Sequence, residues 1–344
     1  MKQVVLTPGE LLDANGHLNQ AGYAYQLIKT YDRKAIKANT LRIKEWDYYL
    51  ITTDEYGLAV TVADNSYMSL LSVTFLDFIA RTEQTFSSMS FLTLGKLGLP
   101  ASSKTGDIHI NNKKIDISIT HEMDHRHLML SIPKFNKQSA LEANIVLTEK
   151  YQDTMVIATP YKENPKAFYY NQKIVGMQAD GSVEFNGKTY SFLPDCSYGI
   201  LDWGRGVWTY ENTWYWSAAN GKINNELFGF NLGYGFGDTS NASENMVFYQ
   251  GKAHKLNGVT FDIPKKSDGT DDYMKPWAFH ASDGRFESNF TPLLDRCSKT
   301  QLAVLVSDQH QVFGTFTGRA ILDDESVVEF NDFLGFAEKV HNKW

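Results

Sequence analysis

The sequence predicts an all-β fold with few short helices, and three observations support this prediction. Short runs rich in Val, Ile, Phe, Tyr and Thr recur along the chain, bounded by Gly, Asn and Asp, as in strands joined by tight turns. Asn-Gly and Asp-Gly pairs, which supply the positive φ angles of hairpins, are frequent. Helical periodicity is rare: only residues 20–37, where Tyr23, Leu27 and Tyr31 recur at a spacing of four, predict a helix.

The first half of the chain is expected to form a β domain over residues 1–170. This half is less regular, because only one of the turn pairs, Asn15-Gly16, lies in it. Residues 160–165, Pro-Tyr-Lys-Glu-Asn-Pro, discourage both a strand and a helix, since two prolines flank a polar interior. We therefore place the domain boundary near residue 170.

The second half, residues 171–344, is expected to form an antiparallel barrel or sandwich, because the other turn pairs punctuate its β-like runs. Residues 335–344 alternate aromatic and charged side chains, as a closing strand does. Trp46, Asp47 and Trp344 are candidates for the contact between the halves. The turn pairs of this half are Asp180-Gly181, Asn186-Gly187, Asn220-Gly221, Asn257-Gly258, Asp268-Gly269 and Asp283-Gly284.

Composition and charge exclude several classes of protein. A chain of 344 residues with 42% hydrophobic and 13% aromatic residues is not disordered. Its 33 basic and 40 acidic residues give a net charge of −7, so no nucleic-acid partner is expected. We find no signal peptide and no apolar run approaching the roughly 18 residues of a membrane span. With two cysteines, Cys196 and Cys297, we expect a soluble cytoplasmic protein with reduced thiols. Its oligomeric state is left open.

The aromatic segment 201–208 carries charged residues on both faces of an expected strand. Asp202 and Trp208 share one face with two glycines, and Trp203 and Arg205 share the other. A buried charge needs a partner, so the residues by themselves favour a structural salt bridge over a catalytic role.

The segment 228–237 places apolar residues on one face of a strand and glycines on the other, where Asn231 is the single amide. Such a bare face accommodates either a closely packed aromatic side chain or a ligand. Aromatic packing is the favoured interpretation, with the nearby tryptophans as its source. In the alternative, Asn231 donates a hydrogen bond inside an apolar cavity.

Three histidines, His121, His125 and His127, would lie on one face of a strand and are the only candidate for a metal cluster. They share this face with Met123, and their spacing matches no known metalloenzyme pattern. A half-exposed polar strand face is the favoured interpretation, so we predict no metal and no cofactor. No nucleophile elbow or phosphate-binding loop is present.

Segments spread along nearly the whole chain match a known family. The matching segments are residues 42–49, 62–67, 168–174 with Gly181, 201–208, 214–216, 229–233, 244–245, 276–277, 290–292, 311–314 and 335–344. On these segments the sequence resembles the family called domain of unknown function 2804, which implies the calycin superfamily and a two-domain, lipocalin-like β-barrel architecture. The superfamily includes carotenoid hydratases and tocopherol cyclases, but the resemblance implies no reaction and transfers no catalytic residue.

Enzymes related through this resemblance share an apolar, often polyene or prenylated, substrate and a few acids that protonate a double bond. Such an acid must stay protonated near neutral pH, as burial allows. We expect Asp202 or Glu244 to be the general acid, with Glu338 a further candidate, and note that Arg205 or Lys44 would instead keep a carboxylate ionised. The expected ligand contacts are Trp203, Arg205, Trp208, Trp214, Tyr215, Trp216 and Asn231.

Three functional hypotheses follow. The first is a hydratase, isomerase or cyclase that acts on an apolar small molecule in a lipocalin-like cavity. The second is a carrier or sensor of a lipid-like ligand, which needs no acid in its cavity. The third is a structural or interaction protein whose barrels are filled with side chains. The sequence does not separate the enzyme from the binder.

Overall fold

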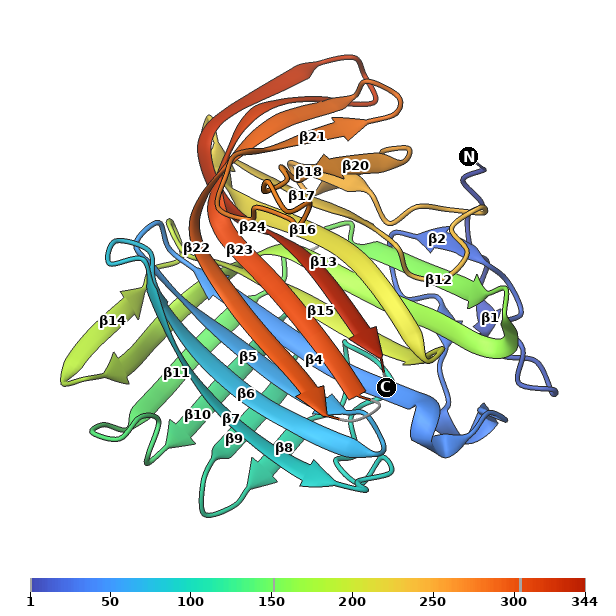
Figure 1. Cartoon of the computed structure of the whole chain (residues 1–344), viewed down its shortest axis with the longest axis horizontal. Helices are drawn as coiled ribbons and strands as arrows, with labels where there is room; N and C mark the ends of the chain where they lie inside the picture. The colour runs from blue at the N-terminus through green and yellow to red at the C-terminus, as the bar shows by residue number, and fades with distance from the viewer. Residues whose placement is uncertain (1, 151, 303–304, 344) are drawn as a thin grey trace.

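The computed structural model describes residues 2–150, 152–302 and 305–343, and it consists mainly of two curled antiparallel sheets (Figure 1). The first sheet has 13 strands and the second has nine. A short parallel pair, β1 (Gly9–Glu10) and β3 (Lys29–Thr30), lies apart from both. The predicted all-β, two-domain architecture is thus confirmed. No helix within the described residues has the length and apolar character needed to cross a membrane.

The first sheet has the strand order β7-β6-β5-β4-β15-β13-β11-β10-β9-β8, and β2, β12 and β14 pair beside this path. Its strands are β2 (Gly22–Ala24), β4 (Ile43–Thr52), β5 (Tyr56–Asp64), β6 (Met68–Asp77), β7 (Thr82–Phe91), β8 (Ile108–Asn111), β9 (Asp116–Glu122), β10 (His125–Ile132), β11 (Leu141–Thr148), β12 (Met155–Tyr161), β13 (Asn164–Phe185), β14 (Lys188–Phe192) and β15 (Tyr198–Val207).

The second sheet has the order β19-β18-β17-β16-β24-β23-β22-β21-β20. Its strands are β16 (Glu211–Ile223), β17 (Glu226–Tyr234), β18 (Met246–Tyr249), β19 (Lys252–Lys255), β20 (Val259–Asp262), β21 (Trp277–Ala281), β22 (Phe286–Leu302), β23 (Leu305–Ile321) and β24 (Val327–Lys343).

The chain passes from the first sheet to the second at residues 208–210, between β15 and β16. The expected boundary at residue 170 instead lies within β13. Residues 160–165 form the tip of the hairpin between β12 and β13, where Tyr161 pairs with Asn164. The prolines therefore mark a turn inside the first sheet and not a linker between domains.

The helix predicted for residues 20–37 is absent. This segment contains β2, β3 and a three-residue 3₁₀ helix at Arg33–Ala35. Tyr23 pairs with Ile157 of β12. Pairing at the edge of the sheet therefore outweighs the weak helical preference of this segment. Two expected turn pairs also differ: Asp180-Gly181 lies within β13 and Asn220-Gly221 lies within β16.

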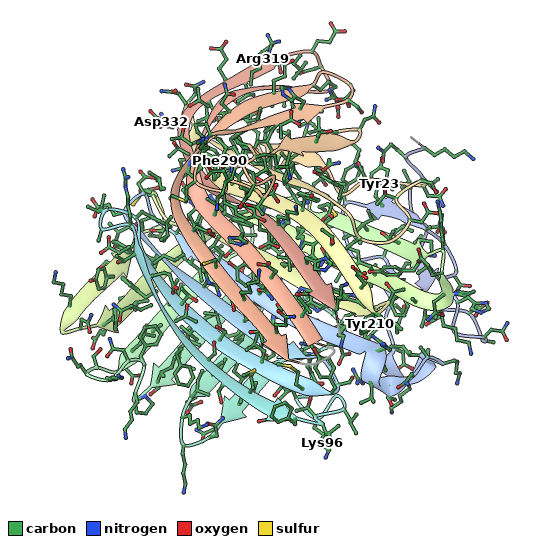
Figure 2. The ribbon with its side chains drawn as sticks, in the orientation of Figure 1. Tyr23, Lys96, Tyr210, Phe290, Arg319 and Asp332 are labelled. Atoms are coloured by element: carbon green, nitrogen blue, oxygen red, sulfur yellow. The ribbon has the colours of Figure 1, made fainter. Side chains whose placement is uncertain are left out.

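Each sheet encloses its own hydrophobic core, and aromatic side chains fill the concave side of the second sheet. There Phe230 contacts Phe286 and Phe316 at ring-centroid distances of 5.1 and 5.0 Å. In Figure 2, Phe290 lies within this packed half, whereas Arg319 and Asp332 lie at its periphery.

A third cluster, here called the interface cluster, joins the two sheets where β22, β23 and β24 cross over β4, β5 and β6 (Figure 1). Its central ring contacts include Phe78 with Phe313, at 5.5 Å, and Tyr48 with Trp216, at 5.9 Å. The buried members are Tyr48, Leu50, Ala59, Leu76, Phe78 and Ile200 from the first sheet, and Trp216, Ala218, Leu294, Phe313 and Phe336 from the second.

Candidate functional site

A buried group of charged side chains lies beside the interface cluster. Asp202 on β15 is directly opposite Lys173 on β13, so both side chains point from the same face of the first sheet. The Lys173 Nζ atom is 2.9 Å from Asp202 Oδ1, and the Asn171 side chain donates to the same oxygen at 2.6 Å. This carboxylate therefore has both an ion-pair partner and a hydrogen-bond donor.

Glu338 approaches the same region from β24 of the second sheet. Its Oε1 atom accepts a hydrogen bond from Trp214 Nε1 at 2.9 Å, and its Oε2 atom accepts one from Gln311 at 3.3 Å. Gln311 in turn accepts from the Tyr48 hydroxyl at 3.1 Å, which links the carboxyl group to the first sheet. Burial, reinforced by the charge of Asp202, raises the pKa of Glu338 from 4.5 to about 7.

Glu244 enters from the segment between β17 and β18. Its backbone carbonyl accepts from Asn231 at 2.8 Å, and Asn231 accepts from Trp216 Nε1 at 2.7 Å. A Cβ atom at Gly233 would lie 2.7 Å from the Glu244 carboxylate, so the bare strand face makes room for an acid. Burial raises the pKa of Glu244, Asp202 raises it further, and Lys173 opposes both.

The three carboxyl groups differ in their ion-pair partners. Among the described residues, Lys173 forms an ion pair with Asp202, and neither Glu244 nor Glu338 forms one. Lys173 also lies 3.9 Å from the centre of the Trp216 ring, where a cation–π contact holds it in place. An unpaired buried carboxyl group favours its neutral form, and burial accordingly raises the pKa of both Glu244 and Glu338.

An aromatic stack lies next to these acids. Phe236 stacks on Trp214 at 4.8 Å and on Tyr169 at 4.4 Å, and Tyr169 stacks on Trp46 at 6.1 Å. Trp208 contacts Trp46, Trp214 and Phe236 in the same group. Burial is the largest cause that raises the pKa of Tyr169, so its phenol stays neutral beside these acids.

The glycines of the two aromatic segments have different neighbours. A Cβ atom at Gly204 would overlap the Trp46 ring, so Trp46 packs directly on this strand. The glycines of segment 228–237 meet other groups, including Val175 at Gly229. No tryptophan ring is among the atoms nearest to these glycines, although the Trp214 backbone lies beside Gly235.

A cleft of about 600 Å³ opens beside the aromatic stack. Phe236 lies between two cleft residues, Gly235 and Gly237, whose φ angles are +101° and +58°. Trp214 follows another cleft residue, Thr213, and donates to Glu338. The cleft residues are Tyr161, Lys162, Glu163, Thr209, Glu211, Asn212, Thr213, Gly235, Gly237, Asp238 and Thr239.

Three residues expected to contact the ligand lie away from this group. Strand alternation turns Trp203 and Arg205 into the core of the first sheet, where Arg205 is 3.0 Å from Asp47. Tyr215 faces the other side of β16 and stacks on Tyr234 at 4.4 Å. Asp202, Glu244, Trp208, Trp214, Trp216 and Asn231 do come together at the interface.

The interface predictions have a mixed outcome. Trp46 lies in the aromatic stack, but Asp47 points to the opposite face of β4. Trp344 lies outside the described residues.

The three histidines do not form one cluster, because the chain turns between β9 and β10. His121 is paired across the hairpin with Arg126 and shares its face. Residues His125 and His127 begin the next strand, where alternation places them on the face opposite Arg126. The triad expected from a continuous strand is therefore divided between two faces of the sheet.

Sequence reasoning did not identify Lys173, Tyr169 or Gln311 as members of the site. Lys173 and Tyr169 lie in residues 168–174, one of the segments that match the family. This match was the feature of the sequence that could have identified them. Their role depends on the pairing of β13 with β15, which the local pattern does not specify.

Comparisons with known proteins agree with this architecture. The family model described as Domain of unknown function (DUF2804) matches residues 2–344. No curated protein sequence matches the chain. The fold is similar to that of a Nitrosomonas europaea protein described as an AttH candidate, with a TM-score of 0.57 and 13% identity, covering 92% of this chain and 98% of that one. It is also similar to kievitone hydratase from Nectria haematococca, with a TM-score of 0.53 and 11% identity, covering 98% of each chain. These similarities establish a shared two-domain, lipocalin-like fold.

Proposed function

We propose that this chain, which belongs to the domain of unknown function (DUF2804) family, binds an apolar small molecule between its two sheets and catalyses water addition to a carbon–carbon double bond. The observation that carries the proposal is the placement of two unpaired, buried carboxyl groups, Glu338 and Glu244, beside a stack of aromatic rings. The apolar surroundings suit such a substrate, and the neutral acids suit proton donation. The similarity in fold to kievitone hydratase supports hydration as the reaction to test first.

Glu338 is the proposed general acid, because its carboxyl group contacts Trp214 of the aromatic stack. Its proton moves to one alkene carbon, and the π electrons form the new C–H bond, which leaves a cation at the other carbon. Water attacks this cation, and the Glu338 carboxylate takes the proton that the water loses. The carboxyl group is thereby restored, and the net reaction is the addition of one water molecule.

The surrounding groups stabilise the cationic intermediate. The face of Trp214, which contacts Glu338, presents negative π density to the cation. Asp202 is bound to Lys173 and Asn171, so it is not proposed as the proton donor. Glu244 is the second candidate acid.

Substrate entry requires an aromatic side chain to move. Phe236 covers Trp214 and Tyr169 and is flanked by two glycines at the edge of the cleft. We infer that rotation of this short segment opens a path from the cleft to the acids, since glycine imposes the weakest barrier to backbone change.

The test begins with native mass spectrometry of the purified protein and identification of any co-purified apolar molecule after organic extraction. The protein is then incubated in D₂O with that molecule, or with a linear polyene and a prenylated phenol as probes. A hydratase yields a product that is heavier by one water and carries deuterium on carbon. Deuterium without added water indicates isomerisation or cyclisation, and binding without either contradicts the catalytic proposal and favours a carrier.

Matched variants assign the acid. Glu338→Gln should lower turnover by about 100-fold or more, because it removes a general acid. Glu142→Gln alters an exposed carboxylate on β11 and should keep wild-type turnover. Equal turnover of Glu338→Gln and wild type would exclude Glu338 as the acid, and Glu244→Gln then tests the second candidate.

A further inference from the structure

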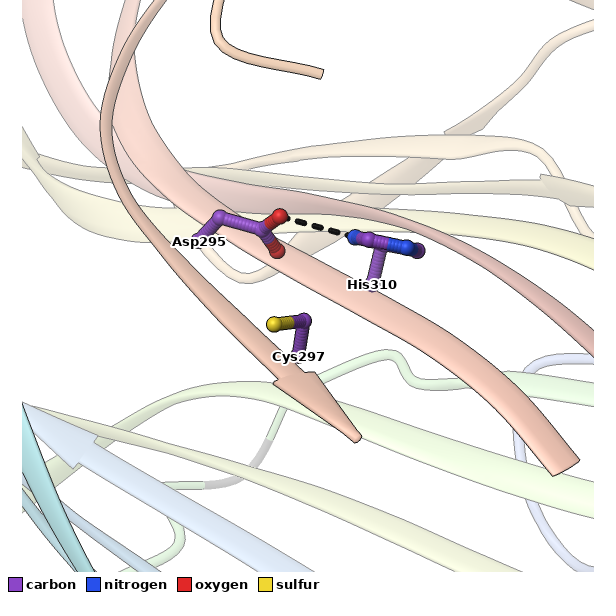
Figure 3. Close-up of side chains that lie close together, drawn as sticks. All are labelled: Asp295, Cys297 and His310. Atoms are coloured by element: carbon purple, nitrogen blue, oxygen red, sulfur yellow. Dashed lines mark hydrogen bonds and ion pairs between the residues drawn. The ribbon is translucent and has the colours of Figure 1, made fainter. Parts of the chain in front are cut away.

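Three metal-ligating side chains meet on β22 and β23, on the face opposite the interface. Cys297 is directly across from His310 in the strand register, and Asp295 lies two residues before Cys297 on the same face. One ligand atom from each residue lies within 4.8 Å of those of the other two. Figure 3 shows the Asp295 carboxylate and the Cys297 thiol directed toward the same side of the imidazole.

The imidazole ring is held in a defined orientation. Tyr273 stacks on His310 with 3.8 Å between the ring centroids and 15° between the planes. His310 Nδ1 is 2.7 Å from Asp295 Oδ2, and His310 Nε2 is 3.5 Å from Asp308 Oδ1. Asp295 Oδ1 is buried and has no hydrogen-bond partner within the described part of the chain. This oxygen retains the capacity to bind another group.

The arrangement does not suit a cysteine nucleophile. In a Cys-His-Asp triad, the thiol and the carboxylate use different imidazole nitrogens. Here a carboxylate oxygen of Asp295 or Asp308 faces each nitrogen of His310, which leaves neither nitrogen for the thiol.

The geometry points to a divalent zinc-type metal site formed by Asp295, Cys297 and His310. Thiolate, imidazole and carboxylate are the ligands that zinc prefers, and three protein ligands leave one position for water. The negative charges of Asp295 and of a Cys297 thiolate balance the charge of the ion. The metal replaces the thiol proton, which leaves to solvent, so binding involves no change of oxidation state.

The surroundings permit a cation at this position. Cys297 is exposed, so an ion can reach the ligands from solvent. The nearby cation, Lys339, is opposite His310 on β24, and its ammonium group is bound to Asp271 at 2.6 Å. Asp308 adds a negative charge on the far side of the imidazole, although Lys299 binds it at 2.8 Å.

This site is independent of the proposed hydration site. Neighbouring residues on β23 point to opposite faces, so Gln311 contacts Glu338 at the interface while His310 points away from it. Loss of the metal should therefore leave the hydration chemistry intact.

Cobalt(II) titration of the full-length protein, after chelator treatment, tests the site. We expect a thiolate-to-cobalt charge-transfer band that saturates at one equivalent and disappears when Zn²⁺ is added. The band should be absent in Cys297→Ser. It should persist in Cys196→Ser, which removes the other exposed thiol. His310→Ala should weaken cobalt affinity at least about tenfold, because it removes a direct ligand.

Thermal unfolding separates loss of the site from loss of the fold. In chelator, Cys297→Ser should melt at the wild-type temperature, and added Zn²⁺ should raise the Tm of wild type and Cys196→Ser but not of Cys297→Ser. Absence of the cobalt band in the wild type would overturn the proposal. An equal band in Cys297→Ser would also overturn it, since the cobalt would then be bound elsewhere.

Discussion

At the residue scale, the buried acids at the interface have the same functional group but different neighbours. Asp202 accepts from Asn171 and pairs with Lys173, so its charge is compensated. Glu338 receives hydrogen bonds from two neutral donors, and these do not offset the cost of burying a charge. The difference arises from the partners and not from the amino acids, because an aspartate and a glutamate have similar pKa values in water.

Glu338 should make the folded protein less stable as the pH rises from about 4.5 to about 7. Its pKa is about 7 in the folded chain and 4.5 ordinarily, so in this interval the folded state holds a proton that the unfolded state has lost. The full destabilisation, present above pH 7, is on the order of 3 kcal/mol. Glu338→Gln cannot ionise and should therefore be more stable than wild type at pH 8 by an amount that vanishes near pH 4.5.

Urea denaturation at both pH values measures this difference. Any constant effect of the amide cancels, because the prediction concerns the change with pH. Glu142→Gln, on the surface, should show no comparable change. A stability difference for Glu338→Gln that is the same at pH 4.5 and pH 8 would contradict the raised pKa.

At the element scale, two long strands create the site. β13 pairs with β11, β12, β14 and β15, and its register shifts near Gly176, which has a φ of +91°. This irregularity bends a strand that would otherwise be too long for one straight pairing, and it lies directly after the segment carrying Lys173. β24 is an inner strand between β16 and β23, and it carries Glu338 to the interface.

Ending the chain after Leu334 should abolish cooperative unfolding. The deletion removes the part of β24 that pairs with both β16 and β23, together with buried Phe336 and Val340. The loss should exceed about 5 kcal/mol, comparable to the whole stability of many domains. Circular dichroism during heating measures it. Lys343→Ala, which removes only an exposed ion pair with Glu211, should cost less than about 1 kcal/mol. A wild-type melting curve for the shortened chain would refute the prediction.

At the scale of the whole molecule, the two sheets behave as one body because the interface cluster is apolar and buried. Phe313 of the second sheet contacts Phe78 of the first, and Trp216 contacts Tyr48. The acids lie beside this apolar contact, so any separation of the sheets would admit water to them. A site between domains thus depends on the packing of both.

Differential scanning calorimetry should show a single transition for the wild type. Phe313→Ala should lower its midpoint, at a cost of about 3–5 kcal/mol, and broaden it as the two halves unfold separately. Phe316→Ala is the matched control: this residue lies in the core of the second sheet, so it should also destabilise but without uncoupling the halves. Two transitions in the wild type would show that the interface does not couple the sheets.

Much of the fold was predictable because it depends on local patterns. Alternation indicated that Asp202 and Trp208 share one strand face and that Trp203 and Arg205 share the other. The turn pairs indicated many short antiparallel strands, although the prolines at 160–165 suggested a boundary where the structure has a hairpin. Two nearby prolines indicate that regular strand pairing ends there. They do not indicate whether the chain then returns to the same sheet.

The sequence by itself determined the all-β class, the alternation of side chains between two faces within an uninterrupted strand, and the acids available for chemistry. Only the tertiary structure decided that Lys173 pairs with Asp202, that Glu244 and Glu338 meet them, and that Cys297 lies opposite His310. The physical reason is that side-chain alternation is a property of a single strand. Strand neighbours and sheet packing depend on contacts between residues far apart in the chain, and a local pattern does not encode them.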